Sequence, residues 1–156
     1  MNTSRRKVLK GTSGAAVMGL AMAAGLLRTH GAWAQTWNKA AFETRSFNDT
    51  VKAMGGTTAV ESKDIAIVSP DIAENGAVVP FSIASKIPKT ESIALLVEKN
   101  PNTLAANFLI PEGTEAGIST RVKMGQTSNV IALVKADGKY YYTAKEVKVT
   151  LGGCGG

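Results

Sequence analysis

The sequence predicts an antiparallel β-sandwich preceded by one helix, in a chain of 156 residues. Three observations lead to this fold class. From Asp64 onward, apolar residues occur in short runs that often alternate with polar residues, as in strands with one buried face. Residues typical of turns, chiefly Gly, Pro and Asn, separate these runs. Between Phe47 and Met54, before the first run, apolar residues instead follow helical spacing.

The helix is expected over residues 38–54. Phe47, Val51 and Met54 stand at positions i, i+4 and i+7, so they share one helical face. Gly55-Gly56 follows directly and supplies a C-terminal stop. An apolar stripe of this kind more often belongs to a core than to a binding surface, so we expect this face to pack inside the domain.

Six runs are interpreted as strands, because each is short and rich in β-branched or aromatic residues. The runs are 65–68, 77–84, 92–98, 117–124, 129–136 and 140–150. Six or seven strands at this spacing favour a sandwich. Asp137-Gly138 predicts a two-residue hairpin between the last two runs. Pro80 predicts an edge strand or a bulge, because proline cannot donate a ladder hydrogen bond.

The last run continues almost to the end of the chain. In residues 147–151, valine and leucine alternate with lysine and threonine, so this strand is expected to anchor the chain in the sheet as far as residue 151. Residues 35–151 then form one domain with a single modest core. Residues 152–156, with the sequence GGCGG, form a separate C-terminal arm.

Other conspicuous residues have structural interpretations. Residues 70–81 are expected to form a turn followed by an edge strand, and Asn100-Pro101 a turn. Arg121 and Lys123 are expected on a solvated strand face. The three tyrosines at residues 140–142 are expected to pack in the sheet rather than to bind a ligand.

Residues 1–34 predict a signal peptide. They contain five of the 18 basic residues and no acidic residue, then an apolar stretch from Gly11 to Leu27, and small residues before a cleavage site after Ala34. The apolar stretch is too short and too weak for a stable membrane-spanning helix.

The sequence SRRKVLK, which starts at Ser4, follows the twin-arginine pattern, through which folded proteins are exported. Val8 departs from the pattern, since Phe is commoner there. An ordinary signal peptide that happens to carry two arginines is the alternative. The expected location is the bacterial periplasm, and export in the folded state suggests that a cofactor or a partner is assembled beforehand.

The charge and the residue types of the mature chain exclude several functions. The net charge of +6 belongs mainly to the signal peptide, and the remainder is nearly neutral, so nothing favours a nucleic-acid partner. Cleavage also removes His30, the only histidine. With one cysteine and no histidine, the mature chain cannot form a Ser/His/Asp or Cys/His catalytic set or a His/Cys metal site. We expect no catalytic residue, metal ligand or bound cofactor.

The only cysteine, Cys154, lies between two glycine pairs: Gly152 and Gly153 before it, Gly155 and Gly156 after it. Glycine lacks a Cβ and adopts almost any backbone angle, so this segment predicts a thin, flexible carrier arm that presents the thiol to buried sites. Fully extended, it spans at most about 17 Å. The alternatives are a functionless surface cysteine, an intermolecular disulfide and a lipid anchor, although the position fits neither the prenylation nor the lipoprotein signal.

The ending KVTLGGCGG (148–156) resembles the SoxY sulfur-carrier proteins of bacterial thiosulfate oxidation. Three further blocks, PDIAENGAVVPF (70–81), VEKNP (97–101) and STRVKM (119–124), also look like blocks of that family. The resemblance extends over essentially the whole mature domain and agrees with the twin-arginine leader. It implies an immunoglobulin-like sandwich in which Cys154 is the covalent attachment point for sulfur.

The resemblance also implies partners. These are SoxZ, a small β-protein without its own signal, in a heterodimer, and the enzymes SoxAX, SoxB and, in some organisms, SoxCD, which dock transiently. SoxAX would couple thiosulfate to the thiol, and SoxB would release sulfate and leave a persulfide. The protein itself would catalyse nothing and bind no membrane.

Two other functions stay open at this point. One is a structural subunit that uses Cys154 for an intermolecular disulfide. The other is a thiocarboxylate-type carrier at Gly156, which would need ATP to adenylate its carboxylate and would not meet ATP in the periplasm.

Overall fold

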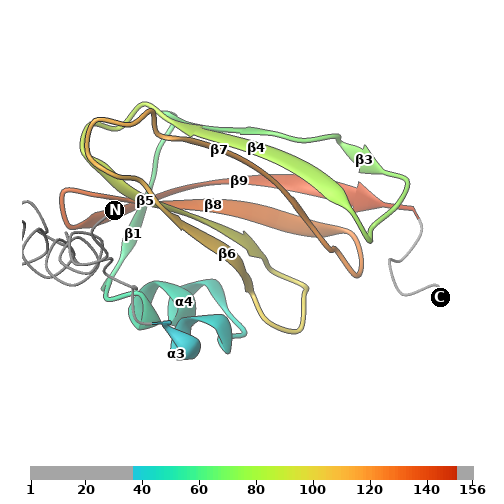
Figure 1. Cartoon of the computed structure of the whole chain (residues 1–156). Helices are drawn as coiled ribbons and strands as arrows, with labels where there is room; N and C mark the ends of the chain where they lie inside the picture. The colour runs from blue at the N-terminus through green and yellow to red at the C-terminus, as the bar shows by residue number, and fades with distance from the viewer. Residues whose placement is uncertain (1–36, 151–156) are drawn as a thin grey trace, which may run out of the picture. The chain divides into compact units, whose positions relative to one another are not determined.

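The structure is a computed structural model that describes residues 37–150; the predicted signal peptide and the C-terminal arm lie outside the described residues. Within that range the chain forms two helices and nine strands (Figure 1). In chain order they are α3 (Lys39–Phe42), α4 (Phe47–Ala53), β1 (Ala59–Glu61), β2 (Ile65–Val68), β3 (Ile72–Ala73), β4 (Val79–Ser85), β5 (Thr90–Val97), β6 (Leu104–Leu109), β7 (Gly117–Val122), β8 (Ser128–Ala136) and β9 (Lys139–Val149).

The strands form two sheets that face each other. The larger sheet has the order β1-β9-β8-β5-β6, and β3 also pairs with β9; the smaller sheet has the order β2-β4-β7. All pairings are antiparallel except those of β1 and β3, which run parallel to β9. Figure 1 shows β4 and β7 on one side of the larger sheet and both helices on the other. The predicted sandwich is therefore confirmed, with the helices as a third layer.

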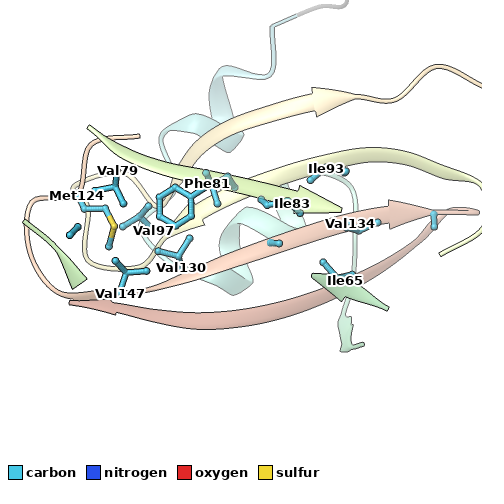
Figure 2. Packing of buried hydrophobic residues seen from close by; sticks show 14 residues of the cluster. Ile65, Val79, Phe81, Ile83, Ile93, Val97, Met124, Val130, Val134 and Val147 are labelled. Carbon is cyan, nitrogen blue, oxygen red and sulfur yellow. The ribbon is translucent and has the colours of Figure 1, made fainter. Parts of the chain in front are cut away.

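Strands β5 and β8 are buried on both faces because they lie in the middle layer. In β5, Ile93, Leu95 and Val97 join the core between the sheets. Figure 2 labels Ile93 and Val97 in this core. The intervening Ala94 and Leu96 belong to a second cluster beneath the helices. This double burial explains why β5 and β8 have nearly continuous apolar sequences, whereas a sheet with one solvated face shows alternation.

The sequence predicted one continuous helix over residues 38–54. This is wrong, because two short helices, α3 and α4, occupy the segment. Ser46 has an extended backbone (φ −143°, ψ 155°) and caps α4, where its side chain accepts a hydrogen bond from Asp49 N. The break also lets Thr44 O accept a hydrogen bond from Thr103 N, next to β6. Capping and this contact with the sheet outweigh the helical propensity of the segment.

The predicted apolar face of this segment is confirmed. Val51 is buried against the larger sheet, and Phe47 and Met54 pack around it. The helix ends at Gly55, whose φ of +91° favours glycine. At Gly56 a Cβ would lie 2.7 Å from the ring of Tyr140, so the chain can pass this ring only with glycine there.

Each of the six predicted strand runs is confirmed to within a few residues, and the Asp137-Gly138 hairpin is confirmed as well. Asp137 (φ 48°) and Gly138 (φ 72°) both have positive φ, as a two-residue type I′ turn requires. Three strands were not predicted: β1 and β3, which are very short, and β6. In β6 the side chains of Ala105, Ala106 and Asn107 carry little strand propensity.

Pro80 does not mark β4 as an edge strand, since β4 lies between β2 and β7. The register with β2 ends at Val68–Ser82, however, so Pro80 lies beyond the end of β2 and pairs only with Arg121 of β7. On the β2 side, therefore, no neighbouring strand needs a hydrogen bond from residue 80.

Candidate functional site

The predicted site residues, Cys154 and its four flanking glycines, lie outside the described residues, so their prediction stays a prediction. The structure does describe the part of the chain from which they continue. We call residues 148–150 the arm root: the last two residues of β9 and the threonine that follows. Cys154 is four residues beyond Thr150.

The arm root extends beyond the part of β9 that pairs with β8. The β8–β9 register runs from Ala136–Lys139 to Ser128–Val147 and ends there. Val147 itself is fully buried in the core between the sheets. Any order in residues 148–150 must therefore come from other segments.

On one side the arm root is held by β3. Lys148 N donates to Asp71 O at 2.9 Å, and Thr150 N donates to Ala73 O at 3.2 Å. Ala73 is buried in the core, which fixes β3 in turn. Figure 1 shows β3 beside the end of β9. This two-residue strand thus occupies the position next to the arm root.

On the other side a threonine side chain takes the place that β8 no longer fills. Val149 N donates a hydrogen bond of 2.9 Å to Thr127 Oγ1, from the loop that precedes β8. All three backbone N–H groups of the arm root therefore have a partner. Hydrogen bonds of this kind suppress fraying at the end of a strand.

Lys145 braces the segment that leads into β3. Its ammonium donates to Ser69 O at 2.7 Å and lies 2.9 Å from Asp71 Oδ1. The hydrogen bond from Lys145, together with its positive charge, lowers the pKa of the Asp71 carboxyl. Because Asp71 is exposed, the ion pair alone contributes little. The bond to the Ser69 carbonyl adds a second attachment from β9 to this segment.

The loop that contains Thr127, residues 123–127, is bonded to two other loops, residues 74–78 and 98–103. Met124 N donates to Gly76 O at 2.7 Å, and the Met124 side chain is fully buried in the core between the sheets, where Figure 2 shows it with Val79 and Val147.

Asn100 connects the loop of residues 98–103 to the loop that contains Thr127. Its Nδ2 donates to Lys123 O at 2.8 Å, and its Oδ1 accepts from Gly125 N at 3.2 Å. The sequence predicted a turn at Asn100-Pro101; the structure adds that the side chain joins two loops. The blocks 70–81, 97–101 and 119–124 thus meet at the end of the domain that carries the arm root.

The remaining side chains singled out by the sequence have the structural places expected of them. Tyr140 is buried, and Tyr142 packs against Phe47 with the two rings tilted by 56° and their centroids 5.0 Å apart. Arg121 and Lys123 are exposed, although β7 ends at Val122, so Lys123 lies just outside the strand.

Residues 37–150 contain no group of three or more His, Cys, Asp or Glu side chains placed to hold a metal ion. Neither described helix is long and apolar enough to cross a membrane.

Comparison with known proteins assigns the chain to a family. The family profile described as "Sulfur oxidation protein SoxY" matches residues 51–154. The chain belongs to the SoxY family. The match reaches Cys154, the predicted attachment residue, and the resemblance seen in the sequence is confirmed.

A solved structure agrees with this assignment. The chain is similar to the sulfur carrier protein SoxY from Chlorobium limicola f thiosulfatophilum, with a TM-score of 0.61 and 36% identity over 67% of this chain and 96% of that one. A superoxide reductase (neelaredoxin) from Ignicoccus hospitalis has a TM-score of 0.49 and 15% identity over 55% of this chain and 78% of that one. A search of curated proteins found no match. Membership in the SoxY family places the chain in sulfur oxidation, as a carrier.

Sequence reasoning missed the residues that hold the arm root. Lys145 and Ser69 are 76 residues apart in the chain, and Thr127 and Val149 are 22 apart. A lysine on a strand or a threonine in a loop carries no sequence signal for such a contact, because only the topology brings the segments together.

Proposed function

We propose that this protein carries sulfur intermediates covalently on Cys154 and presents them to the enzymes of thiosulfate oxidation in the periplasm. The observation that carries the proposal is the SoxY family match, which ends on Cys154 itself. The described structure supports it: the chain is hydrogen-bonded up to Thr150, only four residues before the thiol. The thiol therefore starts from a fixed point on the domain.

The chemistry needs only one atom of this protein. The Cys154 sulfur forms a bond to the outer sulfur of thiosulfate, loses its proton, and gives a Cys–S–S–sulfonate; an electron pair leaves to a haem enzyme of the SoxAX type. Water then attacks the sulfonate sulfur in a SoxB-type enzyme, which releases sulfate and leaves a Cys–S–SH persulfide. Where a SoxCD-type enzyme exists, it oxidises that outer sulfur before a second hydrolysis.

The protein contributes a thiol and a tether and no catalytic group or cofactor. The glycines beside Cys154 add no side chain to the backbone, which suits a segment that enters narrow channels. Ordering five such residues costs on the order of 1–2 kcal/mol each, so docking is weak and reversible. A carrier that passes its cargo among several enzymes requires this.

SoxZ is the proposed permanent partner, and the twin-arginine leader fits export of the folded pair. The enzymes SoxAX, SoxB and SoxCD are transient partners on this proposal. A membrane or a nucleic acid plays no part in it.

The experiment that tests this function is the substitution Cys154→Ser. The variant should fold like the parent and bind SoxZ equally well, because residue 154 lies beyond the last strand, yet it should lose sulfate release from thiosulfate completely. Circular dichroism and a binding assay with SoxZ provide the controls for folding. Retained thiosulfate-dependent sulfate release by Cys154→Ser would overturn the proposal.

A further inference from the structure

β3 is too short to be stable as a strand in its own right. It contains two residues, and a parallel pair of this length contributes few hydrogen bonds. Together with the residue before it, β3 nevertheless supplies two acceptors to the arm root, Asp71 O and Ala73 O. Figure 1 shows β3 beside the end of β9. The pairing of β9 with β8 does not extend to this end.

The contacts made by Lys145 explain how so short a strand keeps its place. Lys145 is on β9 itself, three residues before the arm root, and it reaches across to Ser69 O (2.7 Å) and the Asp71 carboxylate (2.9 Å). The side chain thus connects β9 to the segment that enters β3. Only about a third of the lysine side chain is exposed, so solvent competes with these contacts less than at an open surface.

We propose that Lys145 and Thr127 are positioning residues for the sulfur carrier, because they hold the arm root in place and so set how many residues separate the last fixed residue from the Cys154 thiol. The proposal rests on the function proposed above for Cys154. With the root held, four residues separate the fixed Thr150 from the thiol. With the root released, the last fixed residue is the buried Val147, seven residues from the thiol.

The number of residues between the last fixed residue and the thiol matters for docking. Four extended residues reach at most about 14 Å, and seven reach about 25 Å, so release of the root nearly doubles the maximum reach of the thiol from its last fixed residue. Each extra residue that must be ordered when the arm enters an enzyme opposes docking by about a factor of ten in the equilibrium constant. A clamped root therefore favours binding of the arm without changing the chemistry at the thiol.

The test compares three variants of the full chain with SoxZ present. Lys145→Met removes both contacts of the ammonium, Thr127→Val removes the hydroxyl that binds Val149 N, and Lys145→Arg retains donors for Ser69 O and Asp71. Lys135→Met is the matched control, because Lys135 forms a similar ion pair of 2.8 Å with Glu91 near the Asp137-Gly138 hairpin instead of the arm root.

The first measurement is amide hydrogen exchange of residues 148–150, which does not depend on any enzyme. We expect exchange about tenfold faster or more in Lys145→Met and Thr127→Val, parent-like exchange in Lys145→Arg, and no change in Lys135→Met, since exchange at a strand end follows local opening. Unchanged exchange in both Lys145→Met and Thr127→Val would overturn the clamp.

The second measurement is steady-state loading by SoxAX with the protein as the varied substrate. We expect KM to rise at least tenfold in Lys145→Met while kcat stays within about twofold, because up to three further residues must be ordered on docking and the chemistry at the thiol is unchanged. Faster exchange without any change in KM would show that the clamp is structural and does not position the arm. Absence of sulfur loading on the parent would instead overturn the function proposed above, and the exchange data would still decide whether the clamp exists.

Discussion

At the residue scale, the glycines beside Cys154 matter because they carry no side chain. Gly153 and Gly155 flank Cys154, and both follow the arm root in the sequence. On the proposed function they belong to the carrier arm, so an added side chain should interfere with what the arm enters and leave the core unchanged.

Gly153→Val and Gly155→Val therefore separate a threaded arm from a loose tail. If the arm enters narrow channels, either valine should lower turnover by the loading and unloading enzymes by tenfold or more, as expected for roughly 1.4 kcal/mol or more of clash. The melting temperature and the reaction of Cys154 with a small thiol reagent serve as controls and should stay at parental values. Parental turnover in both variants would exclude channel entry.

Tyr140 leads to a prediction of how the free energy of unfolding depends on pH. Burial raises the pKa of its phenol, and its hydroxyl donates to Met54 O at 2.5 Å. An unfolded tyrosine ionises near pH 10. Below that pH the phenol is neutral in both states, and its contribution to stability is complete; as the pH rises through the folded-state pKa, the unfolded state has already lost its proton and the contribution disappears.

Tyr140→Phe should accordingly cost about 0.5–1.5 kcal/mol at pH 7, through the lost hydrogen bond. It should also make the loss of stability above pH 10 less steep than in the parent. Urea unfolding at pH 7 and at pH 10–11 measures both effects. An equally steep loss in Tyr140→Phe would mean that another group causes it.

At the scale of elements, the middle layer gives the sharpest contrast between neighbouring residues. Leu95 and Leu96 are adjacent in β5, but Leu95 faces the other sheet and Leu96 faces the helices. In a sandwich without the helical layer, Leu96 would face solvent. Its burial depends on two helices of four and seven residues.

Leu95→Ala and Leu96→Ala should therefore destabilise the fold by similar amounts, about 2–5 kcal/mol each, because each leaves a cavity. Leu109→Ala is the control: that leucine is 53% exposed at the end of β6, and its loss should cost less than about 1 kcal/mol. Chemical unfolding gives all three values. A negligible effect for Leu96→Ala would contradict the packing of α3 and α4 on the sheet.

The sequence predicted those elements in which the local residue pattern favours the same structure that the tertiary packing requires. The strand runs, the Asp137-Gly138 hairpin and the apolar face of α4 carry such signals, and the structure confirms them. The split between α3 and α4 depends on the Ser46 cap and on a bond to Thr103, so periodicity alone did not reveal it. β3 exists through its pairing with β9, and no propensity marks it.

The candidate site shows the same division between local and long-range information. The GGCGG ending is local, so the sequence alone identified the family and led to the prediction of Cys154 as the attachment residue. The arrangement that holds the arm root is long-range: it joins the segments around Asp71, Thr127 and Lys145, which the topology alone brings together.

At the scale of the whole molecule, the described domain holds the arm root, residues 148–150, in a fixed position. The two sheets and their loops fix the arm root at one end, and the residues that carry the family match run from α4 to Cys154. The central claim is that the sulfur resides on this cysteine during thiosulfate oxidation.

The most direct test is peptide mass spectrometry of the protein after incubation with thiosulfate and the loading enzyme. The account predicts an added mass of one thiosulfate-derived S–SO₃ group on the peptide that contains Cys154, which a reducing agent removes, and a single added sulfur after SoxB acts. An adduct on the Gly156 carboxylate, or a Cys154 found only in a disulfide with another chain, would contradict it.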